Sequence, residues 1–273
     1  MKIIKIFGST EQQMFQYALY LRLRERGDEV SLCVPRRWIA TDFSLSGYEV
    51  ATAEQMAVYG TSLADKVKAV FGKNADKQNV ISDEFGKYSR EVIEASDGLC
   101  VGSWASPRYF EAASQAVSNA FVLPDEGLSA AAGGVLSLMG DGETVAMLVQ
   151  NPTSAANTCT TDYYNWALAN IRTYIPDVRL LVFTDSPELV KKHMLLPDDC
   201  RMVPTANLTG LDLMQVMLRA SHVICNNTLT AWWAAWLNPN PDKIVIVPQR
   251  WCADGELQPQ DLIPIYWTAI PVT

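Results

Sequence analysis

The sequence predicts an α/β protein with two Rossmann-like domains that face a cleft. In the second half of the chain, four short apolar runs of the buried-strand type alternate with segments whose apolar residues recur at helical spacing. The first half repeats this order of strand and helix less regularly. Strands that alternate with helices are typical of a parallel, doubly wound sheet.

The strands of the second half are the clearest. The four apolar runs are Val145–Val149, Leu180–Phe183, Val223–Cys225 and Ile244–Val247. The helix expected between the first two runs has an apolar stripe made of Tyr164, Ala167, Leu168, Ile171 and Ile175. Pro176 marks its end, because proline cannot continue a helix. A second helix begins with Ser186 as N-cap and Pro187 at the first helical position.

In the first half, two expected strands, Ile3–Phe7 and Val30–Val34, flank one long helix. A third, Leu99–Val101, precedes a helix that begins at Ser106 and Pro107. Residues 122–143 contain glycines and acids between the two halves, which indicates a boundary there. We therefore expect an N-terminal domain over residues 1–130 and a C-terminal domain over residues 131–273.

Composition excludes several classes of function. The 273 residues are 49% hydrophobic, enough to bury one large core or two smaller ones. The net charge is −8 without a long basic run, which argues against nucleic acid or an anionic membrane as partner, since both need clustered Lys and Arg. No apolar run reaches the roughly 18 residues of a membrane span, and the run before Gly8 is too short for a signal peptide. We expect a cytoplasmic chain that does not span a membrane.

Metal chemistry is not indicated either. The six cysteines lie far apart without a CxxC pair, which is typical of a reduced cytoplasmic chain and not of a disulfide framework or a zinc site. The two histidines, His193 and His222, are isolated in the sequence. We therefore predict no metal site and no metal cofactor.

The first expected strand ends in a turn that reads FGSTEQQ. A strand–glycine–helix turn often holds phosphate on free backbone N–H groups at the helix N-terminus. Here the turn has one glycine, Gly8, and an acid, Glu11, which would repel an anion. The alternative is a capping box with Thr10 as N-cap and Gln13 three residues later, in which Glu11 interacts favourably with the helix dipole. We favour the capping box.

Five segments occur in the order seen in a known family. They read QMFQYALYLRLRERGDEV, GSWASPRYF, TTDYYNWALANI, LLVFTDSPELVKK and HVICNNTLTAWWAAWLNPNPDKIVIVPQRW. Together they resemble bacterial α-1,2-fucosyltransferases, glycosyltransferase family 11, over nearly the whole chain and most weakly between residues 40 and 95. The resemblance implies a GT-B architecture, an inverting transfer from GDP-fucose and no essential metal. It also implies that the N-terminal domain is the acceptor side and the C-terminal domain the nucleotide-sugar donor side.

The chain departs from this family at the pyrophosphate clamp, a His-x-Arg-Arg-Gly-Asp-Tyr sequence after the first strand of the C-terminal domain. Here the chain reads LVQNPTS, with Leu148 for the histidine, Gln150 and Asn151 for the arginines, and Pro152 and Thr153 for the glycine and aspartate. Arginine offers a permanent charge and a bidentate fork to the leaving diphosphate, which a neutral amide cannot do. Losing one well-placed electrostatic donor costs on the order of 10²–10³ in rate. The sequence thus predicts a divergent member without the clamp.

The resemblance implies a set of donor-binding residues. They are Gly8, Gln13, Gln150, Asn151, Asp185, Asn227 and Thr228. Structural alternatives stay open: Asp185 as a residue at a helix start, and Asn227 and Thr228 as caps of the helix that carries the core residues Trp232, Trp233 and Trp236.

No catalytic residue is assigned from the sequence. Three carboxylates remain open as the general base: Glu11, Asp42 and Asp185. Three cations near strand ends remain open as substitutes for the clamp: Arg108, Arg201 and Arg250.

Three functions remain open. The first is a glycosyltransferase that resembles the inverting α-1,2-fucosyltransferases and transfers fucose from GDP-fucose to a glycan hydroxyl, or that uses an altered donor. The second is a non-catalytic relative that binds a glycan or a partner enzyme of a polysaccharide assembly pathway, with peripheral association to the assembly complex. The third is a small-molecule binder that uses the ancestral cleft.

Overall fold

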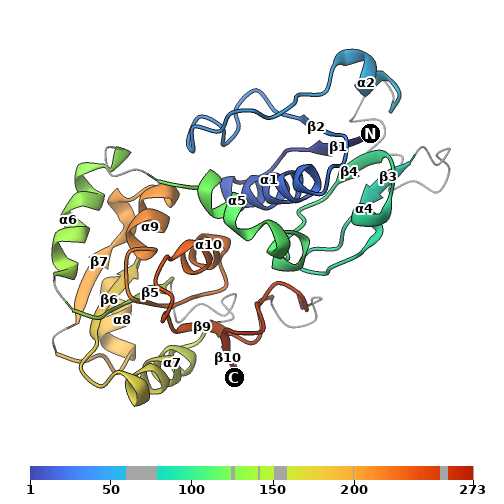
Figure 1. Cartoon of the computed structure of the whole chain (residues 1–273). Coiled ribbons are helices and arrows are strands. Elements are labelled where there is room, and N and C mark those ends of the chain that lie inside the picture. The colour runs from blue at the N-terminus through green and yellow to red at the C-terminus, as the bar shows by residue number, and fades with distance from the viewer. Residues whose placement is uncertain are drawn as a thin grey trace. The chain divides into compact units, whose positions relative to one another are not determined.

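The computed structural model describes residues 1–59, 79–123, 127–140, 142–150, 159–198, 200–252 and 258–272. The chain divides into two compact units (Figure 1). Unit 1 consists of Met1–Val122 and Gln260–Leu262, and unit 2 consists of Leu123–Pro259 and Ile263–Thr273. Each unit contains a parallel sheet with helices, which confirms the predicted α/β fold class. The cleft between the domains stays a prediction, as do the acceptor and donor roles.

Unit 1 is built on parallel strands in the order β2-β1-β4-β3, with β1 in the interior of the sheet. The strands are β1 (Lys2–Lys5), β2 (Val30–Cys33), β3 (Val80–Ser82) and β4 (Gly98–Val101). The helices are α1 (Thr10–Glu25), α2 (Ala53–Ala57), α4 (Glu91–Glu94) and α5 (Ser114–Ala120). Where the sequence predicts a helix at Ser106 and Pro107, two short 3₁₀ helices occur, η1 (Pro107–Tyr109) and η2 (Glu111–Ala113).

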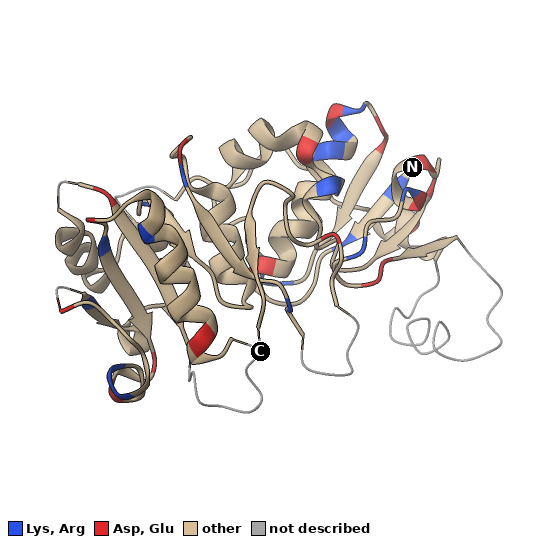
Figure 2. Cartoon of the chain, turned by 90° about the horizontal axis from the view of Figure 1, so that it is seen from below, with Lys and Arg blue, Asp and Glu red and all other residues tan. Residues whose placement is uncertain are grey.

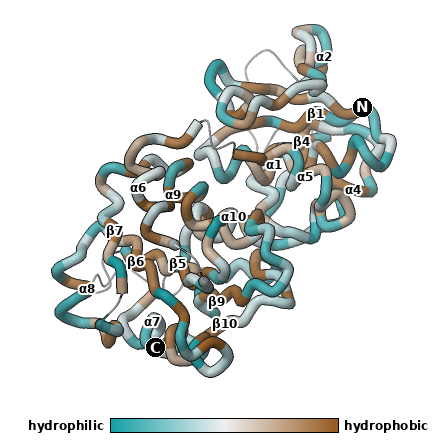
Figure 3. Tube along the Cα trace, turned by 60° about the vertical axis from the view of Figure 1, so that its left-hand side comes forward, coloured by the Kyte–Doolittle hydropathy of each residue, from teal (hydrophilic) through white to brown (hydrophobic). Residues whose placement is uncertain are grey.

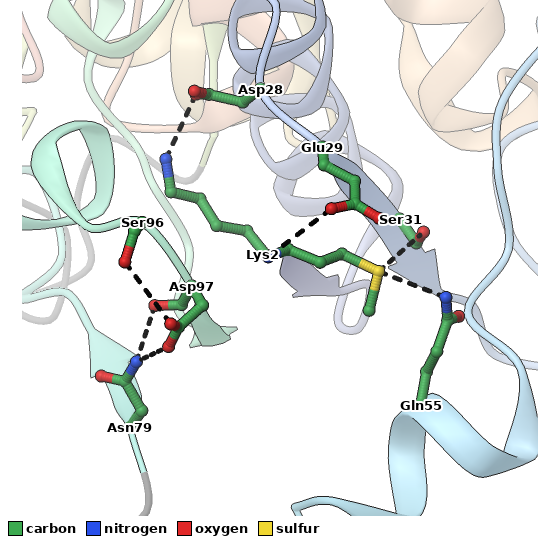
Figure 4. Close-up of polar contacts among 9 residues, drawn as sticks. Lys2, Asp28, Glu29, Ser31, Gln55, Asn79, Ser96 and Asp97 are labelled. Carbon is green, nitrogen blue, oxygen red and sulfur yellow. Dashed lines mark hydrogen bonds and ion pairs between the residues drawn. The ribbon is translucent and has the colours of Figure 1, made fainter.

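Lys2, the first residue of β1, is a charged residue in the core of unit 1. Its side chain is 1% exposed, and its ammonium lies 3.2 Å from a carboxylate oxygen of Asp28, just before β2 (Figure 4). The ammonium also donates to the carbonyl oxygen of Ile93 at 3.4 Å. Although burial opposes the shift, hydrogen bonds from Arg26 and Lys2 lower the pKa of Asp28. The pairing offsets the cost of burying the lysine.

Helix α1 begins with a capping box one residue earlier than predicted. Ser9 is the N-cap: its hydroxyl accepts from the backbone N–H of Gln12, and the Gln12 side chain accepts from the N–H of Ser9. The predicted pair, Thr10 and Gln13, is therefore wrong, although both pairs have the spacing of a capping box. The observed box requires a glycine before it, because Gly8 has a φ of +85° and a Cβ there would lie 2.1 Å from Oε1 of Gln12.

Unit 2 is built on parallel strands in the order β10-β9-β8-β5-β6-β7. The strands are β5 (Thr144–Val149), β6 (Arg179–Thr184), β7 (Arg201–Pro204), β8 (His222–Ile224), β9 (Val245–Pro248) and β10 (Thr268–Ile270). The helices are α6 (Ala130–Met139), α7 (Thr161–Tyr174), α8 (Pro187–His193), α9 (Gly210–Met217) and α10 (Leu229–Leu237), with a 3₁₀ helix η4 (Thr205–Asn207). All four runs predicted as strands in this half lie in the sheet, which confirms that prediction. The edge strands β7 and β10 were not predicted.

The interior strands of unit 2 are buried on both faces. All residues of β5 are buried, and the strands β5, β6 and β9 are mostly hydrophobic along the tube in Figure 3. The predicted apolar stripe of α7, from Tyr164 to Ile171, packs against Val145, Met147 and Val149. Trp232 and Trp233 of α10 are fully buried, as predicted, whereas Trp236, predicted as core with them, is only half-buried. No helix in the described ranges has both the length and the apolarity needed to cross a membrane.

Residues 122–143 contain the passage from unit 1 to unit 2. The division falls between Val122 and Leu123, and α6 lies within this stretch as part of unit 2. The carbonyl oxygen of Leu123 accepts from the side chains of Gln215 and Arg219, each at 3.4 Å. These bonds tie the first residue of unit 2 to the end of α9.

Gln260–Leu262 belong to unit 1, although the chain on both sides of them belongs to unit 2. The backbone N–H of Asp261 donates to the carbonyl oxygen of Gly86 at 2.8 Å. The Asp261 carboxylate accepts from the N–H of Tyr88 at 2.9 Å and from the guanidinium of Arg108 at 2.7 Å. Arg108 also lies over the Tyr88 ring, 4.4 Å from its centroid. Arg108 is thus engaged within unit 1.

Candidate functional site

The strand order of unit 2 reverses between β5 and β8. From β5 the chain adds β6 and β7 on one side of the sheet, and then β8, β9 and β10 on the other. Because all pairings are parallel, the carboxyl ends of the strands meet at one edge, here called the carboxyl edge. Helices α7, α8 and α10 begin at this edge, since each follows a strand that ends there. Open α/β sheets bind ligands outside the carboxyl ends at such a switch point.

Two side-chain amides meet at this switch point. Gln150 directly follows β5, and Asn226 lies two residues beyond the end of β8. Nδ2 of Asn226 donates to Oε1 of Gln150 at 3.2 Å. Asn226 is 1% exposed, whereas Gln150 is exposed. Gln150 therefore offers a neutral oxygen to the buried Asn226. The family that the chain resembles has an arginine at this position.

Thr228 caps α10. Its hydroxyl oxygen accepts from the N–H of Ala231 at 3.3 Å, and the hydroxyl donates to Oδ1 of Asn226 at 2.7 Å. Oδ1 of Asn226 also accepts from the backbone N–H of Thr228 at 3.3 Å. The capping role considered for Thr228 is confirmed, and its role toward a donor stays a prediction.

Asn227 joins three segments of the carboxyl edge. Its Nδ2 donates to the carbonyl oxygen of Trp251, after β9, at 3.0 Å. Its Oδ1 accepts from Sγ of Cys159, just before α7, at 3.7 Å. On the other side of Trp251, Oε1 of Gln258 accepts from the N–H groups of Trp251 and Cys252 at 2.9 and 3.0 Å. The segment after β9 is thereby held at the switch point.

Asp185 follows β6, the strand next to β5. Val149 and Thr184 are paired in the sheet, so Gln150 and Asp185 occupy the next positions along the two strands. The Asp185 carboxylate is exposed and accepts from the hydroxyl of Ser186 at 2.9 Å. Ser186 is the N-cap residue of α8, as predicted, but its side chain makes no capping hydrogen bond.

The structure brings part of the predicted donor set together. Gln150, Asp185, Asn227 and Thr228 lie at the carboxyl edge of unit 2. Asn151 lies outside the described residues, as do Pro152 and Thr153 of the replaced clamp. Gly8 and Gln13 lie in unit 1, after β1.

Gln13 has a structural role in the turn after β1. The side chain is buried, its Nε2 donates to the carbonyl oxygen of Gly8 at 3.0 Å, and its Oε1 accepts from the N–H of Ile39 at 3.1 Å. Glu11 lies in the first turn of α1. The turn therefore caps a helix, and donor binding by Gly8 and Gln13 stays a prediction.

Full positive charge is scarce at the carboxyl edge. Lys and Arg positions are scattered over the ribbon in Figure 2, and Arg250 is the one in the described parts of unit 2 that closely follows the end of a strand. Arg201 is the first residue of β7, which places it at the opposite edge of the sheet. Arg108 lies in unit 1. Three acids share the edge with Arg250: Asp162 in the first turn of α7, Asp185, and Glu188 in the first turn of α8.

The hydroxyl and thiol groups beneath the carboxyl edge are neutral. Tyr163 donates to the carbonyl oxygen of Cys225 at 2.6 Å. Burial raises the pKa of Tyr163, of Tyr164 and of the Cys225 thiol well above their ordinary values. Because the thiolate is the reactive form of cysteine, Cys225 is a packing group.

The described residues include no group of three or more His, Cys, Asp or Glu side chains that could hold a metal ion. His222 begins β8 and His193 ends α8, so both histidines lie toward the amino ends of the strands. The donors at the carboxyl edge are mainly amides and hydroxyls, which suit an uncharged or anionic ligand better than a metal.

A shallow hollow of about 230 Å³ lies elsewhere in unit 2, between α6 and the edge strand β7. Its lining includes Val135, Leu138, Met202 and Leu208, with Asn207 as a polar member. Ligand pockets usually measure about 300–1,000 Å³ and converge several polar groups. The switch point therefore remains the better candidate site.

Sequence reasoning missed two amides that join strand ends. Asn226 joins β8 to β5, and its signal was a polar residue immediately after the apolar run Val223–Cys225. Gln16 in α1 is fully buried; it accepts from the N–H of Phe7 and donates to the carbonyl oxygen of Gly102, both at 2.9 Å. It joins the ends of β1 and β4, where the strand order of unit 1 reverses.

Comparison with known families matches residues 147–271 to the family described as Glycosyl transferase family 11. The matched residues run from β5 to β10 and include the carboxyl edge. The predicted resemblance is confirmed over this part of the chain.

A curated relative is similar over a shorter stretch. The O-antigen biosynthesis glycosyltransferase WbnK of Escherichia coli is 30% identical over 98 residues, which cover 34% of this chain and 31% of WbnK. The chain thus spans about a third of the length of that relative.

Several solved glycosyltransferase structures are distantly similar. The NodZ α-1,6-fucosyltransferase soaked with GDP-fucose has 13% identity and a TM-score of 0.48, over 87% of this chain and 92% of NodZ. The E. coli heptosyltransferase WaaC with ADP-2-deoxy-2-fluoro heptose has 12% identity and a TM-score of 0.43, over 99% and 93% of the two chains. A family 9 glycosyl transferase of Veillonella parvula has 9% identity and a TM-score of 0.47, over 99% and 86%.

Proposed function

We propose, from the match of residues 147–271 to the family described as Glycosyl transferase family 11, that this chain transfers fucose from GDP-fucose to a glycan hydroxyl, with inversion at the anomeric carbon. The donor binds at the carboxyl edge of unit 2. One observation carries the proposal: the residues that match the family supply the strand ends of this edge and include its switch point. A cytoplasmic location and a peripheral association with a glycan assembly complex are part of the proposal.

The reaction requires that negative charge be stabilised on the leaving group. The acceptor oxygen bonds to the anomeric carbon as the bond from that carbon to the diphosphate breaks, and the hydroxyl proton passes to a base. Charge therefore gathers on GDP. Helices α7 and α10 begin at the carboxyl edge, and the free N–H groups and dipoles of helix N-termini favour anions. The exposed amide of Gln150 adds a neutral polar group.

The base is a carboxylate in this proposal. Glu11 and Asp42 belong to unit 1, where Glu11 occupies the first turn of α1 and Asp42 an exposed turn. Asp185 shares the carboxyl edge of unit 2 with the other donor residues and is exposed. We therefore propose Asp185 as the first residue to test for this role.

A second candidate is a non-catalytic relative that binds a glycan or a partner enzyme in polysaccharide assembly. The hydrogen bond between Asn226 and Gln150 favours it, because the position of a clamp arginine is used within the protein. The two candidates differ in whether the chain releases GDP.

The deciding experiment incubates the purified chain with GDP-fucose and a panel of glycan acceptors. Mass spectrometry follows fucosylated product, and a coupled assay follows GDP. Product that forms with the native chain and is lost in Asp185→Asn supports the transferase. GDP release at the background rate, with thermal stabilisation by a glycan but by no nucleotide, supports the non-catalytic relative, since a ligand stabilises the state that it binds.

A further inference from the structure

Resting on the proposed function, we infer that Arg250 is the phosphate-binding residue that replaces the missing clamp in the donor site of unit 2. Arg250 lies two residues beyond the end of β9. Strand β9 is next to β8, whose carboxyl end carries the switch-point residues Asn226 and Asn227. Arg250 therefore belongs to the same edge as Gln150, on the side of the switch point opposite Asp185.

The backbone around Arg250 is fixed from three directions. The N–H of Gln249 donates to the carbonyl oxygen of Ile270 at 2.8 Å, which ties the segment to β10. The N–H of Trp251 donates to Oε1 of Gln258 at 2.9 Å, and the Trp251 carbonyl oxygen accepts from Nδ2 of Asn227 at 3.0 Å. Trp251 itself is buried. A fixed backbone lowers the entropic cost of holding the arginine side chain against an anion.

Asn227 connects the segment that carries Arg250 to two helix N-termini, because it donates to the carbonyl oxygen of Trp251. It immediately precedes Thr228, the N-cap of α10, and its Oδ1 accepts from Cys159, which immediately precedes Thr160, the N-cap of α7. The hydrogen bonds of Asn227 thus join the backbone segment that carries Arg250 to the two helix N-termini and their partial positive charges. An arginine adds to it a full charge and a planar set of donors that match phosphate oxygens.

The other cations of unit 2 in the described ranges do not share this edge. Arg172 and Lys192 lie in the last turns of α7 and α8, toward the amino ends of the strands, and the Lys191 ammonium is already paired with the Glu188 carboxylate at 3.5 Å. Arg179 and Arg201 begin β6 and β7. Two further ones, Arg219 after α9 and Lys243 before β9, precede a strand instead of following one. Arg250 is therefore the cation that topology assigns to the donor phosphates.

Acidic residues at the carboxyl edge influence how much GDP affinity is lost when Arg250 is neutralised. Asp162, Asp185 and Glu188 would repel a diphosphate, and Lys191 offsets only the Glu188 with which it is paired, so neutralising Arg250 leaves an edge whose described net charge is negative. Removing one charged hydrogen-bonding partner weakens binding by about 10- to 100-fold. We expect Arg250→Gln to show a loss in this range.

The experiment is a ³¹P NMR titration with GDP, which measures weak dissociation constants directly. It compares the native chain with Arg250→Gln, Arg250→Lys and Arg201→Gln, after circular dichroism has shown each to be folded. Arg201→Gln is the matched control, because it removes the same charge from an exposed residue at the opposite edge. Arg250→Lys keeps the charge and loses the planar fork, so its affinity should lie between those of the native chain and Arg250→Gln.

Each outcome decides a different point. Loss of GDP binding in Arg250→Gln, with native affinity in Arg201→Gln, supports the assignment. Equal GDP affinity in the native chain and in Arg250→Gln overturns the assignment. An equal loss of GDP affinity in Arg250→Gln and Arg201→Gln overturns it too. Both outcomes leave the proposed function standing. A native chain that binds no GDP contradicts the proposed function and removes the role of Arg250 with it. Should Arg250→Gln fail to fold, an unchanged affinity in Arg250→Lys overturns the assignment and a weakened one supports it.

Discussion

Nδ2 of Asn226 donates to Oε1 of Gln150 at 3.2 Å, and this bond joins the carboxyl ends of β8 and β5 where the strand order of unit 2 reverses. Asn226 is buried, so its amide needs a partner within the protein. Gln150 supplies that partner with a neutral oxygen. An arginine at the same position has donors only, and could not accept from Asn226.

The first prediction concerns GDP affinity. The native chain should bind GDP with a Kd near or above the millimolar range, which corresponds to a binding free energy no better than about −4 kcal/mol. Gln150→Arg and Asn151→Arg should strengthen binding, because each well-placed charged contact contributes about 1.5–3 kcal/mol. Calorimetry on the native chain, the two single variants and the double variant measures the gain.

The same substitution should lower stability. Gln150→Arg leaves Nδ2 of the buried Asn226 without its acceptor, which costs about 1–3 kcal/mol in the free energy of unfolding. Gln115→Arg is the control, since it adds the same charge to an exposed position on α5 of unit 1. It should change neither GDP affinity nor, beyond about 0.5 kcal/mol, stability. Micromolar GDP binding by the native chain would contradict this expectation, because it would mean that Arg250 replaces the clamp arginines fully and not only in part.

The sequence predicts the sheet of unit 2 well because its interior strands are buried on both faces. Continuous apolar runs such as Val145–Val149 then have few other interpretations. The edge strands escape the same reasoning: β7 is partly exposed and begins with Arg201, and β10 has a single buried residue, Ile270. Because β7 was not predicted, the sequence could not show that Arg201 is the first residue of a strand. It therefore could not show that Arg201 lies away from the carboxyl edge.

The register of the first helix could not be predicted from spacing alone. In GSTEQQ, the pairs Ser9–Gln12 and Thr10–Gln13 both fit a capping box. The choice depends on tertiary contacts, because Gln13 is used by the backbone of Ile39, far along the chain. In the same way, the sequence predicts which polar residues follow strands, but it does not predict which of them form hydrogen bonds with each other. Asn226 and Gln150 are far apart in sequence and meet only in the folded sheet.

The second prediction concerns metal content. Protein purified without added metal should contain no stoichiometric zinc or iron, because the described residues present no group of ligands for one. Elemental analysis by mass spectrometry measures this, and one tightly bound metal per chain would contradict it. Donor binding should equally be unaffected by a chelator.

The third prediction concerns Gly8. Gly8→Ala places a Cβ at a φ of +85°, which costs about 1–2 kcal/mol, and the Cβ also meets the side chain of Gln12 that completes the capping box. Losing the cap costs about a further 0.5–2 kcal/mol. Gly27→Ala is the matched control, since its φ is +87° and a Cβ there meets nothing within 4 Å. Urea denaturation should therefore show a larger loss of stability for Gly8→Ala than for Gly27→Ala.

A double-mutant cycle separates the two costs at Gly8. In a Gln12→Ala background the clash is gone, so Gly8→Ala should cost no more than Gly27→Ala does. Equal losses for Gly8→Ala in both backgrounds would show that the glycine is needed for its backbone conformation alone.

The last prediction concerns His222, which is buried at the start of β8. Its Nδ1 accepts from the backbone N–H of Ile244 at 3.0 Å, so the neutral ring carries its proton on Nε2. Burial lowers the pKa of His222, and Glu143, 3.6 Å from Nε2, opposes the shift without cancelling it. Adding a proton to Nδ1 would break the bond to Ile244.

The folded pKa of His222 therefore lies below the unfolded value of about 6.5, and between these two values the unfolded chain binds a proton that the folded chain does not. Stability linked to His222 is fully present above about pH 6.5 and is lost as the pH falls from there toward the folded pKa. We expect the free energy of unfolding, measured in urea from about pH 7.5 to pH 5, to decrease in this window by up to about 1.4 kcal/mol per pH unit. His222→Asn keeps a side-chain acceptor without the titration and should flatten the decrease. His193→Asn, at the exposed end of α8, should keep the native slope, and an unchanged slope in His222→Asn would contradict the assignment.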